Sequence, residues 1–200
     1  TRRGSKGISF IQLYDGSNQN GIQAVADELL VNYEEISRLT TGTSVSIIGK
    51  VVESPAKGQT FEIHAEEVRV IGASSGDLYP LQKKGHTLEF LRDIAHLRPR
   101  TNTLGAVFRL RNTLSWAIHS FFQERDFLYV QTPIITANDA EGAGEMFHVT
   151  ALDLENLPRN SEGKVDYSKD FFGTDVSLTV SGQLGAEVFA LAFSDVYTFG

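Results

Sequence analysis

The sequence contains no cysteine, a single methionine and a single tryptophan, and no long apolar run. Without cysteine the chain has neither a disulfide framework nor a thiolate metal site. No stretch approaches the roughly 20 apolar residues that a membrane span requires, and the first residues do not form a signal peptide. We therefore expect a folded protein without a membrane segment, located in the cytoplasm, with an organellar location left open.

Basic residues are also few. Eighteen Lys and Arg stand against 25 Asp and Glu, which gives a net charge of −7. A protein held on nucleic acid by charge alone needs a basic surface, so this balance argues against such a protein. An enzyme with its basic residues clustered on one face remains compatible. Two hundred residues suffice for two modest domains, and because the last residues have the pattern of a strand, we expect the chain to be a fragment.

The first 72 residues have the pattern of a small all-β unit. Short apolar or alternating segments are separated by turns rich in Gly, Asp, Ser and Pro, and one segment has helical spacing. Five strands with one helix are typical of an OB-fold, a small barrel that binds oligonucleotides. The predicted strands cover residues 8–13, 22–26, 44–53, 60–65 and 68–71, and the predicted helix covers residues 31–39.

The remaining residues predict an α+β unit behind a linker. Residues 73–102 begin with a Gly/Ser-rich stretch and form the predicted hinge. Apolar residues then recur every three or four positions from 104 to 122, which predicts a helix of about six turns. A strand follows at 127–131 and is terminated by Pro133. Near the end, residues 176–180 and 187–193 predict a hairpin around two glycines.

Several segments carry a resemblance to a known family. Residues 5–13 (SKGISFIQL) are similar to the opening strands of an anticodon-binding OB-fold. Residues 97–101 (LRPRT), the long helix and residues 127–133 (FLYVQTP) resemble a motif 1. Residues 141–147 (EGAGEMF) resemble a loop that closes over a bound amino acid. Residues 178–184 (LTVSGQL) resemble an amino-acid-binding strand, and residues 195–200 (DVYTFG) resemble the lead-in to motif 2. Together they resemble the class II aminoacyl-tRNA synthetases of the aspartate, asparagine and lysine subgroup.

The resemblance implies a fold and an activity. It implies an OB-fold anticodon-binding domain at 1–72 with a truncated first strand, a hinge at 73–102, and at 103–200 the first part of a class II catalytic domain, an antiparallel sheet with flanking helices. The implied enzyme is a homodimer, with Pro133 at the interface, that activates an amino acid with ATP and transfers it to tRNA. Residues that hold ATP and Mg²⁺ are expected beyond Gly200, so this fragment alone is expected to be inactive. No side chain within it is assigned as catalytic or as a metal ligand.

The amino acid specificity depends on one position. In the aspartyl enzymes, a lysine three residues after the glutamine of the amino-acid-binding strand binds the substrate carboxylate. Here that place is Ala186, and Glu187 follows it. A neutral or acidic wall suits a carboxamide and repels a carboxylate, so asparagine and tRNA(Asn) are the expected substrates. An aspartyl-tRNA synthetase, discriminating or not, is one alternative, and a non-catalytic OB-fold nucleic-acid-binding protein is another.

Four residues are expected at the amino-acid site. The resemblance implies that Glu141 binds the α-ammonium group, because its loop contains glycines that allow closure. It implies that Ser181 and Gln183 bind the polar backbone atoms of the amino acid and the adenylate, and Glu187 is a candidate acceptor for the substrate amide. The alternative for Ser181 and Gln183 is an ordinary polar hairpin turn.

Three further residues are expected at the anticodon site. The resemblance implies that Phe10 stacks on a base, that Gln23 hydrogen-bonds to it, and that Glu62 makes a third contact. Stacking of one base on an aromatic ring contributes about 1–3 kcal/mol. The alternatives are a barrel-core position for Phe10 and an exposed strand position for Glu62.

Overall fold

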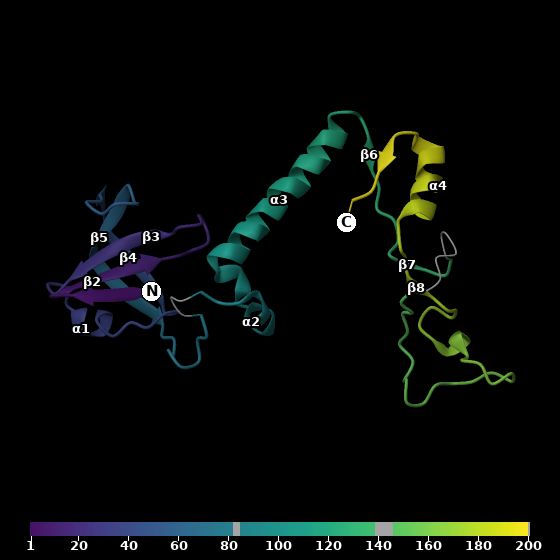
Figure 1. Ribbon diagram of the computed structural model, residues 1–200, viewed down its shortest axis with the longest axis horizontal. Coiled ribbons are helices and arrows are strands. Elements are labelled where there is room, and N and C mark those ends of the chain that lie inside the picture. The colour runs from purple at the N-terminus through teal and green to yellow at the C-terminus, as the bar shows by residue number, and fades with distance from the viewer. Residues whose placement is uncertain (82–84, 139–145, 200) are drawn as a thin grey trace. The chain divides into compact units, whose positions relative to one another are not determined.

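A computed structural model describes residues 1–81, 85–138 and 146–199 of the chain. The chain divides into two compact units, Thr1–Arg111 and Asn112–Gly200 (Figure 1). Within the described ranges, no helix is both long enough and apolar enough to cross a bilayer.

The first unit is built on a five-stranded sheet whose strands follow the order β1-β2-β3-β5-β4. Strands β3 and β5 pair in parallel and the other neighbours are antiparallel. This arrangement confirms the predicted OB-fold. The strands are β1 (Arg2–Ser5), β2 (Ile8–Leu13), β3 (Ile22–Asp27), β4 (Ser44–Glu53) and β5 (Phe61–Gly72).

The core of this unit lies on one face of the sheet. Ile11, Ala24, Ala26 and Val68 are almost fully buried there, together with Ile36. Ile36 comes from α1 (Tyr33–Ile36), a single turn where the pattern predicted a helix over 31–39. The predicted helix was too long: Ile36 is fully buried and Leu39 packs partly against the core from the turn that follows, whereas Val31 is exposed.

Strand β5 is continuous, whereas the pattern predicted two strands with a break after residue 65. The alternation of inward and outward side chains changes phase at the exposed Glu66 and Glu67. The partner strand absorbs this change with a register shift between Ile48 and Gly49. A side chain at Gly49 would place its Cβ 2.2 Å from the backbone oxygen of His64, so the shift requires glycine at that position.

The region after the barrel contains α2 (Leu88–Asp93), a 3₁₀ turn η1 (Arg98–Arg100) and the start of the long helix. Thr87 caps α2, because its hydroxyl accepts a hydrogen bond from the amide of Phe90. Helix α3 (Asn102–Gln123) has 22 residues and confirms the predicted six-turn helix. The domain boundaries predicted at residues 72 and 102 stay predictions.

The second unit contains two short strand pairs. Strand β6 (Leu128–Tyr129) pairs in parallel with β9 (Val196–Tyr197), and β7 (Ile135–Thr136) pairs antiparallel with β8 (Ser177–Leu178). A 3₁₀ turn, η2 (Tyr167–Lys169), lies in the loop before β8. Tyr197 is buried and its ring stacks on that of Phe122 with centroids 4.4 Å apart, which joins α3 to β9.

The predicted hairpin near the end of the chain is wrong. Residues Gln183–Phe193 form a helix, α4 (Figure 1). Leu184, Val188 and Leu191 follow helical spacing, and the intervening alanines favour a helix. The two glycines that indicated a turn instead allow the start of α4 to pack closely against Thr132.

Candidate functional sites

The first candidate site lies on the face of the barrel opposite its core. Strand pairing sets Gln12, Gln23 and Glu62 in one row across β2, β3 and β5, and sets Phe10, Val25 and His64 in the next row. Since alternate residues of a strand point to opposite faces, both rows lie on the face away from Ile11 and Ala24. The structure therefore brings all three expected anticodon residues onto one surface.

Phe10 is half-buried on this surface, while its neighbour Ile11 enters the core. Its ring lies under the guanidinium of Arg3, whose Cζ is 5.2 Å from the ring centroid. The two residues are opposite each other in the β1–β2 register, so the contact is a cross-strand pair. Phe10 is thus an aromatic group on the outer face and not a core residue.

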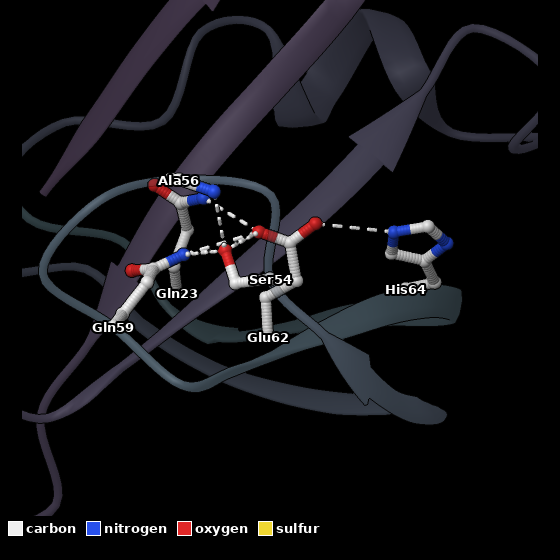
Figure 2. Close-up of polar contacts among 6 residues, drawn as sticks. All are labelled: Gln23, Ser54, Ala56, Gln59, Glu62 and His64. Atoms are coloured by element: carbon white, nitrogen blue, oxygen red, sulfur yellow. Dashed lines mark hydrogen bonds and ion pairs between the residues drawn. The ribbon is translucent and has the colours of Figure 1, made fainter.

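Glu62 and Gln23 are both buried, with exposed fractions of 4% and 7%. Oε2 of Glu62 accepts hydrogen bonds from Nε2 of Gln23 at 3.1 Å, Oγ of Ser54 at 2.8 Å and Nε2 of Gln59 at 3.1 Å. Nε2 of His64 lies 3.2 Å from Oε1. Figure 2 shows Gln23, Ser54 and Gln59 on one side of the carboxylate and His64 on the other. We call these five residues the Glu62 cluster.

The environment of Glu62 favours its ionised form. Burial, the largest single effect, acts to raise its pKa, but the hydrogen bonds from Ser54, His64 and Gln23 and the charge of His64 outweigh burial. The pKa of Glu62 therefore lies below its ordinary value. A charge that is almost removed from water needs such partners. Glu62 is therefore a buried, hydrogen-bonded carboxylate and not an exposed glutamate on a strand.

Two members of the cluster, Ser54 and Gln59, were missed from the sequence. Both belong to the turn that joins β4 to β5, and the Ser-Pro and Lys-Gly pairs there indicated only a hairpin. The hairpin closes through a hydrogen bond from the amide of Ser54 to the backbone oxygen of Thr60 at 2.9 Å. The alternation of β5 places Glu62 on the same face as His64 and away from Ile63, but no sequence signal indicated its two partners in the turn.

The second candidate site lies at the start of α4. Ser181 precedes the helix, and its hydroxyl accepts a hydrogen bond from the amide of Gln183 at 3.2 Å. Nε2 of Gln183 donates to Oε1 of Glu187, one helical turn later, at 2.9 Å. All three are exposed. The predicted residues thus form one polar group, although on the first turns of a helix and the loop before it, not on a strand.

The glycines of this segment allow α4 to start very close to Thr132, in the segment between β6 and β7. A Cβ on Gly182 would lie 2.5 Å from Oγ1 of Thr132, and a Cβ on Gly185 would lie 3.0 Å from Cγ2 of the same residue. A side chain at Gly182 would force either the helix start or the Thr132 side chain to move, and one at Gly185 would crowd the same side chain. The exposed Pro133 comes directly after this contact.

The remaining predicted residue, Glu141, lies outside the described residues. Among residues 1–81, 85–138 and 146–199, no three His, Asp or Glu side chains form a group suited to a metal ion.

Comparison with known proteins agrees with this architecture. Residues 1–71 match the model of the OB-fold nucleic acid binding domain, and residues 87–200 match that of the tRNA synthetases class II (D, K and N). The asparagine–tRNA ligase of Desulfitobacterium hafniense is 58% identical over the full chain, and that of Vibrio cholerae is 59% identical over 203 aligned residues. The chain spans 43% and 44% of these two proteins.

Solved structures share the fold. The asparaginyl-tRNA synthetase of Pyrococcus horikoshii, complexed with asparaginyl-adenylate, matches with a TM-score of 0.79 at 21% identity, over 100% of this chain and 42% of that one. The Entamoeba histolytica asparaginyl-tRNA synthetase matches with a TM-score of 0.77 at 21% identity, over 99% of this chain and 42% of that one. Because the family model matches residues 87–200, more than half of the chain, the chain belongs to the class II tRNA synthetases of the D, K and N type.

Proposed function

We propose that the complete protein containing this chain is an asparagine–tRNA ligase that acts in the cytoplasm. The observation that carries the proposal is the identity of 58–59% with asparagine–tRNA ligases along the entire chain. The absence of a lysine at Ala186, on the first turns of α4, supports asparagine over aspartate, because a lysine there would suit a second carboxylate.

The reaction joins asparagine to its tRNA in two steps. The carboxylate of asparagine attacks the α-phosphorus of ATP, which forms asparaginyl-adenylate and releases pyrophosphate. A hydroxyl of the terminal tRNA ribose then takes the acyl group and releases AMP. We assign no side chain of this chain as a base, because positioning and charge neutralisation suffice for such transfers. Residues beyond Gly200 are proposed to hold Mg²⁺, which would neutralise phosphate charge.

The residues near α4 would hold the amino acid. Ser181 and Gln183 offer a hydroxyl and a carboxamide at the helix start, and Glu187 offers a carboxylate beside them. A carboxylate accepts the N–H groups of an asparagine side chain and repels the charge of aspartate. Glu141 would bind the α-ammonium group.

The outer face of the barrel would bind the anticodon. Phe10 supplies a half-buried ring for stacking, and Gln23 supplies an amide held in place by Glu62. We propose these three residues as the anticodon site. A non-catalytic OB-fold protein would have no use for the polar group at α4, so the enzyme is the better proposal.

The active form is proposed to be a homodimer with Pro133 at its interface. Helix α3 leaves several large apolar side chains exposed in the single chain, which supports its burial against a second copy: Val107, Phe108, Leu110, Leu114, Trp116 and Phe121. Sedimentation of the complete protein and of a Leu114→Glu variant tests this. A monomeric wild type would contradict the proposal.

Charging of tRNA transcripts tests the proposed activity directly. The complete protein is expected to attach asparagine to a tRNA(Asn) transcript with ATP, and to discriminate against the same transcript with a substituted anticodon. Salt-dependent RNA binding with no anticodon preference and no aminoacylation would support the non-catalytic alternative instead.

A further inference from the structure

We propose that Ser54 and Gln59, on the hairpin between β4 and β5, are positioning residues for tRNA recognition that act on Gln23 through the carboxylate of Glu62. The proposal rests on the proposed function, because it assigns Gln23 to the reading of an anticodon base. It adds two residues and a mechanism by which the hairpin determines base selectivity.

The Glu62 carboxylate has few free acceptor sites for a ligand. An ionised carboxylate has about four lone-pair sites, two on each oxygen. Oε2 already accepts from Gln23, Ser54 and Gln59, and Oε1 faces His64. Only 4% of the residue is exposed. Oε2 is therefore fully engaged with protein donors, and Oε1 keeps one acceptor site beside His64. Because so little of Glu62 is exposed, its main effect on a bound base is through the donors it orients.

The orientation of the Gln23 carboxamide determines which base it can pair with. A carboxamide has a donor end and an acceptor end, and which end faces a base decides which base it pairs with. Because Glu62 is an acceptor, it holds Nε2 of Gln23 at 3.1 Å and turns Oε1 away from the carboxylate. An amide held in one orientation recognises one hydrogen-bonding pattern, whereas an amide free to flip recognises two.

The hairpin between β4 and β5 maintains this orientation of Gln23, because its side chains hold the Glu62 carboxylate. Gln59 donates from Nε2 to Oγ of Ser54 at 2.7 Å and to Oε2 of Glu62 at 3.1 Å. Ser54 in turn donates to the same Oε2 and accepts from the amide of Ala56 at 3.2 Å. As Figure 2 shows, the hairpin thus holds the carboxylate from the same side as Gln23. Without these two donors, Glu62 would be free to rotate toward solvent or His64 and would release Gln23.

The test measures anticodon selectivity of the complete protein. Charging is compared for the tRNA(Asn) transcript and for transcripts with one substituted anticodon base, in the wild type and in Ser54→Ala, Gln59→Leu and Gln23→Ala variants. We expect the two hairpin variants to lose selectivity by about tenfold, the effect of one hydrogen bond to a charged group. The loss should occur at the same base as in Gln23→Ala, while asparagine-dependent pyrophosphate exchange stays unchanged.

Three controls separate positioning from stability. Ser54→Thr keeps the hydroxyl and should keep the selectivity. Ser46→Ala, at an exposed position of β4, the strand that leads into the hairpin, should behave as the wild type. Gln59→Leu added to Gln23→Ala should cause no further loss, because residues that act through one group are not additive.

The outcomes distinguish the inference from the proposed function. If Gln23→Ala loses selectivity but Ser54→Ala and Gln59→Leu keep it, the inference is overturned and the anticodon site stands. An equal loss with every transcript in both hairpin variants would show a role in barrel stability alone and would also overturn it. If Gln23→Ala itself has no effect on charging, the proposed anticodon site fails and the inference fails with it.

Discussion

Gln183 and Glu187 are joined by a hydrogen bond of 2.9 Å from Nε2 to Oε1 across the first turn of α4. The bond orients the carboxamide of Gln183 and leaves the other carboxylate oxygen of Glu187 with acceptor sites. Two residues predicted separately for the amino-acid site therefore act as a pair.

Replacement of Glu187 tests this pair. Glu187→Ala in the complete protein should raise the KM for asparagine about tenfold, because both the amide acceptor and the orientation of Gln183 are lost. The stability should change by no more than about 0.5 kcal/mol, as for other exposed pairs one turn apart on a helix. Pyrophosphate exchange at varied asparagine concentration measures the first effect and thermal unfolding the second. Glu155→Ala, in an exposed loop, is the matched control; an unchanged KM in Glu187→Ala would remove Glu187 from the site.

Gln23→Ala should separate the two steps of the reaction. Removal of the amide deletes a proposed base contact and one donor to a buried carboxylate, a loss of about 1.5–3 kcal/mol. The kcat/KM for tRNA should therefore fall by about 10- to 100-fold, while asparagine-dependent pyrophosphate exchange keeps its rate. Equal loss of both activities would contradict a role restricted to tRNA.

Only some residues of the proposed anticodon site could be predicted from the sequence. The strands that carry Phe10, Gln23 and Glu62 followed from alternation and turn residues, because period-two patterns and Gly/Asp turns are local signals. The hydrogen bonds of Ser54 and Gln59 to Glu62 could not be predicted, since they depend on how the turn between β4 and β5 directs its side chains toward Glu62.

The start of α4 was predicted wrongly, although its sequence contained a helical pattern. Gly182 and Gly185 led to the prediction of a turn, because glycine commonly marks turns. Their actual requirement is the close approach of α4 to Thr132, a contact with a residue 50 positions earlier in the chain. The pattern of Leu184, Val188 and Leu191 was the better signal for this segment.

A paired substitution tests that contact. Gly182→Ala would place a Cβ 2.5 Å from Oγ1 of Thr132, so we expect the start of α4 to shift, together with Ser181 and Gln183, to the extent that the Thr132 side chain does not rotate away. We expect a cost of about 1–3 kcal/mol in stability and a higher KM for asparagine. Thr132→Ala removes Oγ1 and should restore part of both quantities when combined with Gly182→Ala. Additive losses in the double variant would show that the two residues are not in contact.

The pH dependence of barrel stability tests the Glu62 cluster. Because the folded-state pKa of Glu62 lies below its ordinary value of 4.5, the ionised cluster stabilises the fold above that value and loses this contribution as the pH falls through the folded-state pKa. The barrel transition should therefore occur at higher temperature in the wild type than in Glu62→Gln at pH 7, and the difference should shrink below pH 4.5. Calorimetry of both proteins from pH 7 to pH 3 measures it; a difference that grows toward low pH would contradict the assignment.

The most direct test of the central claim is ATP–pyrophosphate exchange by the complete protein with asparagine and with aspartate as the only amino acid. The amino-acid site at the start of α4 is proposed to lack a lysine for a second carboxylate, since Ala186 occupies that place. Exchange should depend on asparagine, and aspartate should support a kcat/KM at least about a hundredfold lower, equivalent to about 2.7 kcal/mol. Exchange that is as efficient with aspartate, or more so, would contradict the account.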